Sequence, residues 1–200
     1  MKKLPVTLIF IASVWFTAKA QQAIPELLKE PVTWQFERFG LPPVFAPNIP
    51  YKGAEELRFS PGMFKKDSKQ YFTYAFVAQL DNTSAISQND IRNYLLVYFK
   101  GLCSSTAKDR KLVVDTSKIT VGIEKKRGEL NNEIMYNALV NAFGVFTDGA
   151  PVQLNMEVKV LMDTQAKRTY LLFIASPYEK TDAVWKELYT IQKNFMLPAR

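Results

Sequence analysis

Carboxylates are the residues best able to do acid–base chemistry in this sequence, because its 200 residues include no histidine. Glu55 and Glu56 form an acidic pair, with Arg58 close by. A glycosidase needs two carboxyl groups about 5 to 9.5 Å apart. Adjacent residues of a strand point to opposite faces, so a strand would require a second acid from elsewhere, such as Glu37. We therefore interpret Glu55 and Glu56 as solvated surface acids, with a carboxylate-dependent hydrolase as the alternative.

The missing residue types exclude most other catalytic classes. Without histidine there is no Ser-His-Asp or Cys-His catalysis and no HExxH zinc site. Cys103 is the only cysteine, so it allows no intramolecular disulfide and no thiolate cluster, and we predict a buried, inert thiol. Neither a phosphate-binding glycine motif nor a calcium-loop motif occurs. We therefore predict no cofactor and no metal, and favour a protein without catalytic activity.

One short match to a catalytic motif remains. Residues 105–108, Ser-Thr-Ala-Lys, fit the S-x-x-K pattern of penicillin-binding enzymes, in which the lysine lies on the same helical face as the serine. The companion Ser-Asp-Asn and Lys-Thr-Gly motifs are missing, and the tetrad follows a predicted helix instead of opening one. We interpret it as a chance match.

A binding site is the remaining kind of functional site, and the N-terminal arm is its best candidate. Residues 21–50 interleave prolines with large aromatic side chains. Prolines at this density interrupt helices and strand ladders, whereas a disordered tail would carry fewer aromatics. We therefore expect an extended arm whose rings insert into the domain. In the favoured interpretation the arm clamps the core. In the alternatives it forms the wall or lid of a binding cleft, or it docks into a neighbouring protein.

The candidate binding residues combine the aromatic side chains of the arm with charged neighbours. They are Trp34, Phe36, Arg38, Phe39, Phe45, Tyr51, Glu55, Glu56 and Arg58. Such a set suits a groove for an amphiphile or for a partner protein.

The elements that must position these residues follow from the apolar periodicity. Alternation with a period of two predicts strands over 56–60, 70–80, 119–123, 134–143, 152–162 and 168–175. A period of 3.6 predicts one helix from a Ser87 cap to about Gly101, and a closing helix after a Thr181 cap. Residues 108–118 fit either a strand or a loop. This order predicts an α+β domain, with an antiparallel meander of about six strands packed by two or three helices.

The longest alternation, over 152–162, also predicts which face is buried. Its apolar side chains share one face, and polar side chains that include Glu157 and Lys159 share the other. We therefore expect one buried face and one wet face. The 168–175 strand is apolar on both faces, which predicts a central position in the sheet.

The first 20 residues have the pattern of a secretory signal peptide, with a charged start, an apolar run and a small-x-small motif ending at Ala20. The apolar run is shorter than the roughly 20 residues that span a bilayer. We expect a secreted or periplasmic product cleaved near Ala20, without a later transmembrane segment. The arm (21–50) then precedes a single domain (51–200). Cleavage removes three basic residues, so the positive charge is mild and no nucleic-acid partner is expected.

The closing elements resemble a known structural group. A strand that ends in Ala-Ser-Pro at 175–177 precedes a helix that carries Trp185, Ile191 and Phe195. This order is similar to the α/β/α sandwich of the PsbP, DcrB and Mog1 group, over residues 51–200. The group includes photosystem accessory proteins and bacterial envelope proteins, and the resemblance transfers no functional residue. We predict an exported, noncatalytic envelope accessory or binding protein whose partner is an envelope protein or an amphiphilic ligand.

Overall fold

Seven strands form one antiparallel sheet in the computed structural model, which describes residues 26–81, 84–126 and 134–198. The strands are β1 (Gln35–Leu41), β2 (Gly53–Phe59), β3 (Tyr74–Leu80), β4 (Thr120–Lys125), β5 (Ile134–Phe143), β6 (Pro151–Asp163) and β7 (Arg168–Ser176). The predicted α+β class is confirmed. The predicted signal peptide lies outside the described residues.

One strand, β1, was not among the six predicted, and it comes from the arm that was predicted to lie extended over the domain. It pairs antiparallel with β2 along its whole length, from Gln35 opposite Phe59 to Leu41 opposite Gly53. Prolines 31 and 42 flank this stretch, and no proline lies between them. Every residue of β1 therefore keeps the backbone N–H that a strand ladder requires, and the prolines only bound the strand at its two ends.

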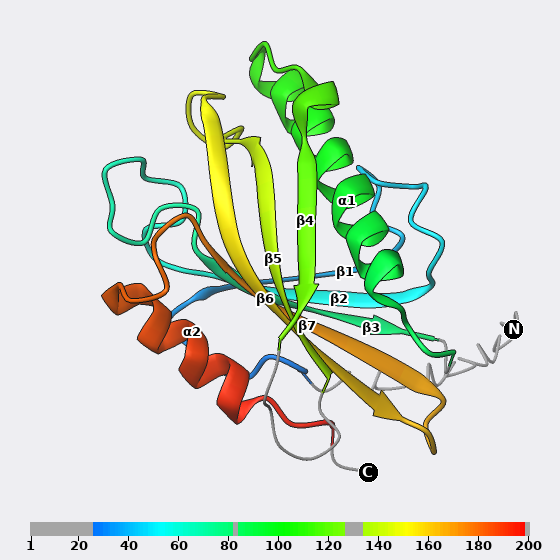
Figure 1. The fold of residues 1–200 in the computed structure, drawn as a ribbon. Helices are drawn as coiled ribbons and strands as arrows, with labels where there is room; N and C mark the ends of the chain where they lie inside the picture. The colour runs from blue at the N-terminus through cyan, green and yellow to red at the C-terminus, as the bar shows by residue number, and fades with distance from the viewer. Residues whose placement is uncertain (1–25, 82–83, 127–133, 199–200) are drawn as a thin grey trace, which may run out of the picture.

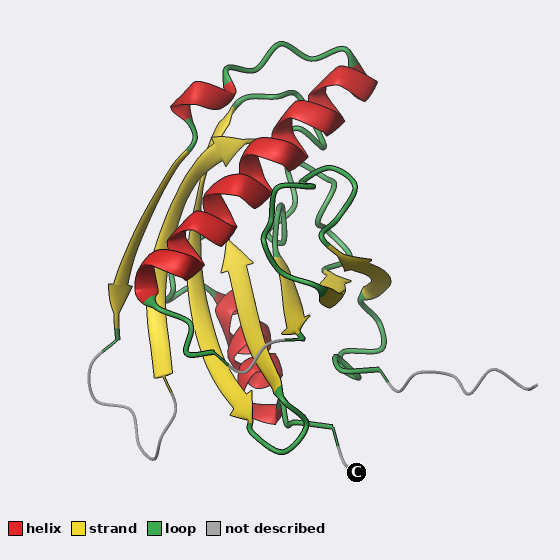
Figure 2. Cartoon of the chain, turned by 90° about the vertical axis from the view of Figure 1, so that its right-hand side faces the viewer, coloured by secondary structure: helices red, strands yellow, loops and turns green. Residues whose placement is uncertain are grey.

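The sheet consists of two meanders that meet at its centre. Its strand order is β1-β2-β3-β7-β6-β5-β4, so β3 and β7 pair with each other although they are far apart in sequence. The predicted central position of the last strand is confirmed, because β7 lies between β3 and β6. The α1 helix (Gln88–Arg110) connects β3 at the centre to β4 at the far edge. It covers one face of the sheet, while α2 (Ala183–Asn194) covers the other (Figures 1 and 2).

The α1 helix is longer than its sequence pattern predicted. It begins at the predicted Ser87 capping box, but it continues past Gly101 to Arg110 and ends at Lys111 in the left-handed conformation, with φ of 58°. The S-x-x-K tetrad therefore lies within the last turns of this helix. Residues 111–118 contain no strand and end in a 3-10 turn, Thr116–Lys118. The α2 helix has Asp182, not Thr181, as its N-cap.

A second boundary also differs from the prediction. The strand expected from residue 70 begins only at Tyr74, because residues 60–73 form a series of hydrogen-bonded turns. Phe72 has a φ of 46° there, so it cannot extend the ladder. Its ring still enters the core, stacked against Tyr74 with 6.0 Å between ring centroids.

Each face of the sheet has its own hydrophobic core. The core under α1 is rich in aromatic rings, and Phe76, Phe173 and Tyr94 form a nearly parallel stack within it. The core under α2 includes Trp185 and receives Trp34 from the arm. Cys103, on the buried side of α1, is fully buried, and burial raises the pKa of its thiol to about 11, as expected for an inert cysteine.

The polar face of β6 is wet only at its start, where Gln153 is exposed, and not along its whole length as predicted. Glu157 and Lys159 are 1% and 7% exposed, because α2 and the preceding 176–182 segment lie over this face. Lys180 donates to Glu157 over 2.8 Å, Lys126 over 3.2 Å and Tyr189 over 3.2 Å. Burial acts to raise the pKa of Glu157, but the two lysines outweigh burial and hold that pKa below its usual value.

Candidate functional site

The two acids predicted to be solvated on the surface are both fully buried, each on a different face of β2. Glu55 points toward α1 and Glu56 points toward α2, and each has an exposed fraction of 0%. The alternation of strand side chains therefore separates the acids as expected. The interpretation as solvated acids is wrong, because segments distant in sequence cover both faces of this strand.

The same alternation divides the nine predicted binding residues into two groups. Phe39, Phe45, Tyr51 and Glu55 lie on the α1 side of the sheet. Trp34, Phe36, Arg38, Glu56 and Arg58 lie on the α2 side. A single groove lined by all nine residues therefore does not exist.

Glu55 lies between two tyrosines of α1. The hydroxyl of Tyr94 donates to one carboxylate oxygen over 2.7 Å, and the hydroxyl of Tyr98 donates to the other over 2.8 Å. These tyrosines are four residues apart and therefore share one face of the helix. Burial raises the pKa of Glu55 to about 7; the two hydroxyls act in the opposite direction, and the nearby Glu37 carboxylate raises it further. Glu55 is thus a buried carboxyl group that titrates near neutral pH.

A cavity of about 200 Å³, which we call the α1-side cavity, opens beside these tyrosines. Its walls are mainly aromatic, and they include Phe39, Phe45, Phe59, Phe64 and Tyr98. Leucine and methionine side chains complete the apolar lining, and Glu37 is the one carboxylate among the lining residues. A preformed apolar cavity with few polar groups is the usual form of a small-molecule site.

One polar atom of this cavity region lacks a partner. Tyr74 lines the α1-side cavity, and its fully buried hydroxyl has no hydrogen-bond partner among the described residues. Leaving a buried hydroxyl unpaired costs about 1 to 3 kcal/mol. Burial also raises the pKa of Tyr74 well above its usual value, so the hydroxyl stays protonated and can both donate and accept. The hydroxyl itself is closed off from the cavity, because its oxygen has essentially no accessible surface.

Close contact between the arm and α1 closes one side of this cavity and predicts an effect at Gly101. A Cβ at this position would lie 2.2 Å from the Phe45 carbonyl oxygen. Gly101→Ala gains about 1 kcal/mol of helix propensity, whereas displacing the arm costs about 1 to 3 kcal/mol. We expect a net loss in the free energy of unfolding of about 1 kcal/mol, measured by urea denaturation.

The control is Ser104→Ala, at an exposed position of the same helix. It should leave the free energy of unfolding unchanged within about 0.5 kcal/mol or raise it slightly. A Gly101→Ala protein as stable as this control would show that the arm does not press against the helix.

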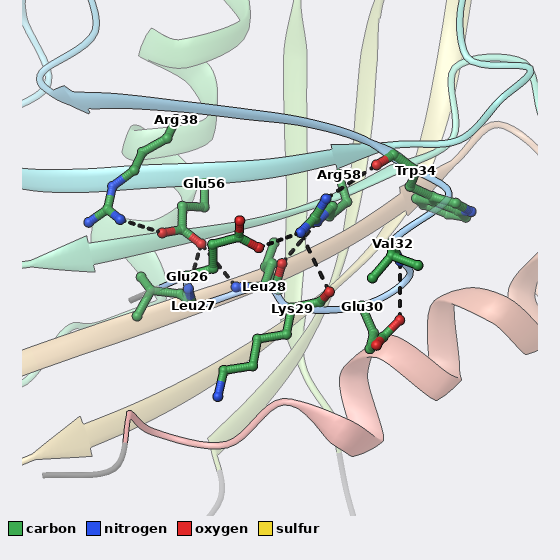
Figure 3. Close-up of polar contacts among 10 residues, drawn as sticks. All are labelled: Glu26, Leu27, Leu28, Lys29, Glu30, Val32, Trp34, Arg38, Glu56 and Arg58. Carbon is green, nitrogen blue, oxygen red and sulfur yellow. Dashed lines mark hydrogen bonds and ion pairs between the residues drawn. The ribbon is translucent and has the colours of Figure 1, made fainter. Parts of the chain in front are cut away.

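On the other face, Glu56 anchors the start of the arm (Figure 3). One carboxylate oxygen accepts the backbone N–H of Leu27 over 2.6 Å and that of Leu28 over 2.9 Å. The other oxygen forms an ion pair with Arg38 of β1 over 3.0 Å. The first oxygen is therefore hydrogen-bonded, whereas the second is fully buried and is held by the charge of Arg38 without a hydrogen bond.

Arg58, two residues further along β2, completes this anchor (Figure 3). Its guanidinium donates to the carbonyls of Leu28 over 2.9 Å and Trp34 over 3.3 Å, and it pairs with Glu26 over 2.7 Å. It also lies 4.5 Å from the centre of the Phe36 ring. Five of the nine predicted binding residues thus hold the arm against the sheet: Trp34, Phe36, Arg38, Glu56 and Arg58.

Sequence reasoning missed most of the α1-side cavity. Phe64 and Phe146 come from turns where no periodicity marks a buried side, whereas Phe72 was predicted as part of the 70–80 strand and not as part of a cavity. Tyr98 was recognised only as part of an apolar helix stripe, and Glu37 only as a possible second acid. Among the described residues, no group of three histidine, cysteine or acidic side chains could hold a metal ion, and no helix is long and apolar enough to cross a membrane.

Comparison with protein-family models, with curated proteins and with solved structures finds no match for this chain.

Proposed function

We propose that this protein is an exported, noncatalytic binding protein that holds a small, largely apolar ligand in the α1-side cavity. The observation that carries the proposal is a cavity of about 200 Å³ whose walls are mainly aromatic, completed by leucine and methionine side chains and one carboxylate, Glu37. Protein cores are normally close-packed, so an unfilled cavity of this kind supports a ligand site. The proposal that the protein is exported rests on the signal-peptide pattern of residues 1–20. The proposal that it acts in the cell envelope rests on the resemblance to the PsbP, DcrB and Mog1 group.

The arm has two roles in this proposal. Its first part, with Trp34, is a clamp that packs under α2, as the favoured interpretation expected. Its second part, with Phe39 and Phe45, forms a wall of the cavity. Both roles coexist because the chain passes from one face of the sheet to the other along β1.

The size of the cavity limits the ligand. A cavity of about 150 Å³ in another protein holds one benzene molecule, so the 200 Å³ here suits a single ring with a short substituent or the end of a longer chain. Toluene, indole and benzyl alcohol are therefore suitable probes. We expect saturable binding with one site per protein, measured by isothermal titration calorimetry.

Filling the cavity tests where the probes bind. Leu102, on α1, lines the cavity, so Leu102→Trp should weaken probe binding at least about tenfold, a loss of about 1.4 kcal/mol. The matched control is Leu139→Trp, at a partly exposed position on the opposite face of β5. If none of the probes bound the parent protein, or if Leu102→Trp bound them as tightly as the control, the proposed function would be wrong.

A carboxylate-dependent hydrolase is the second candidate, because Glu37 and Glu55 lie on the same face of adjacent strands and Glu37 acts on the pKa of Glu55. A carboxyl group with a raised pKa that lies near a second carboxyl group is the usual arrangement of an acid–base pair. However, Glu55 has no exposed surface and both its oxygens accept from tyrosines, so substrate cannot reach it. Hydrolysis of a glycoside panel that disappears in both Glu37→Gln and Glu55→Gln would favour this candidate over simple binding.

A further inference from the structure

The α1-side cavity combines aromatic walls with negative charge. Glu37 lines the cavity directly, and Glu55 lies one layer behind it, bonded to the lining residue Tyr98. No lysine or arginine is among the described lining residues. The carboxylate in the cavity lining therefore has no basic side chain beside it in that lining, and a positively charged ligand would complement it.

The walls are also suited to a cation. The face of an aromatic ring carries partial negative charge, and a cation within about 6 Å of the ring centre gains about 0.5 to 2 kcal/mol. Phe39, Phe45 and Tyr98 surround the cavity with edge-to-face contacts, at 6.1 and 5.0 Å between neighbouring ring centres. Rings set at right angles to one another present both faces and edges to the space that they enclose.

We propose, building on the proposed function, that the ligand of the α1-side cavity is an organic cation, an amine or ammonium group on a small apolar body. Glu37 at the wall and Glu55 behind Tyr98 supply the negative charge, and the aromatic rings contact the apolar body and the charged group. An anionic ligand of the same shape is repelled by the two acids.

Three probes of nearly equal shape and different charge test this assignment: benzylammonium, benzyl alcohol and benzoate. At about pH 8, above the Glu55 pKa of about 7, and at low salt, we expect benzylammonium to bind about tenfold more tightly than benzyl alcohol. Benzoate should show no binding. Calorimetry on the full chain gives all three dissociation constants.

Removing one charge at a time identifies the residues responsible. Glu37→Gln should weaken benzylammonium about fivefold and leave benzyl alcohol within about twofold, because only the charge is lost. Glu55→Gln should act in the same direction, since glutamine keeps the shape of the side chain. Glu179→Gln, at an exposed glutamate in the 176–182 segment, is the matched control and should change neither affinity.

Proton release provides an independent readout. Glu55 titrates near pH 7, with Tyr94 and Tyr98 of α1, Tyr74 of β3 and Glu37 of β1 as the titratable groups around it. A bound cation favours the ionised carboxylate, so benzylammonium should release a fraction of a proton at about pH 7. Calorimetry in buffers of different ionisation enthalpy measures this fraction, which should disappear in Glu55→Gln.

The outcomes separate this inference from the proposed function. If benzyl alcohol binds as tightly as benzylammonium, or benzoate binds as well, the cation assignment is overturned while the cavity remains a binding site. If no probe binds, the proposed function itself fails. Tight benzylammonium binding that is insensitive to Leu102→Trp would place the cation elsewhere and would also overturn the assignment.

Discussion

Replacing Arg58 by alanine is expected to lower the free energy of unfolding by about 3 kcal/mol, because each buried group left without its hydrogen-bond partner costs about 1 to 3 kcal/mol. The substitution leaves the carbonyls of Leu28 and Trp34 without their donor. It also removes the cation that lies over the Phe36 ring. The pair with Glu26 adds less, because the Glu26 side chain is 48% exposed and screened by water. Urea denaturation monitored by circular dichroism measures the loss.

The matched control is Arg168→Ala. Arg168 pairs with Asp81 over 3.6 Å at the surface, with side-chain exposed fractions of 45% and 53%. Exposed pairs contribute little, so we expect a change within about 0.5 kcal/mol. Limited trypsin digestion should cut at Lys29 faster in Arg58→Ala than in the control, because the arm is released first. Equal losses in the two variants would contradict the anchoring role of Arg58.

Lowering the pH from about 8.5 to about 5 is expected to raise the free energy of unfolding by about 3 kcal/mol, because one pKa unit corresponds to about 1.4 kcal/mol. The pKa of Glu55 is about 7 in the folded protein, against a model value of 4.5. Between these two values the folded state binds one proton more than the unfolded state, so stability falls as the pH rises. The chain has no histidine to titrate in this window, and the pKa of Glu157 is lowered, so its contribution is lost only at more acidic pH.

Two variants assign this pH dependence. Glu55→Gln should flatten the profile between about pH 5 and 8.5, and it should be more stable than the parent protein at the alkaline end. Glu157→Gln should keep the slope while losing stability overall, since it removes a buried carboxylate whose pKa lies below the window. A flat profile for the parent protein would show that Glu55 is hydrated and not desolvated as its burial indicates.

The elements with long, regular periodicity were predicted almost to the residue. The strand expected over 134–143 is β5 (Ile134–Phe143), and that expected over 152–162 is β6 (Pro151–Asp163). Their side chains alternate over ten or more residues, and such a pattern depends only on the local backbone. The predicted ends of elements were wrong where the prediction depended on a single residue. Gly101 resembled a helix end, but its missing side chain leaves room for the arm and not for a turn.

By itself the sequence determined the antiparallel α+β class, the apolar faces of the main elements and the absence of histidine chemistry, because periodicity and residue type are local properties. Only the tertiary structure decided that Glu55 and Glu56 are buried and that a cavity lies beside Tyr98. The reason is that β2 is covered by residues that lie far from it in sequence. Glu55 is 39 residues from Tyr94, and Glu56 is 28 residues from Leu28. No local pattern records which distant segment will exclude water from a given face.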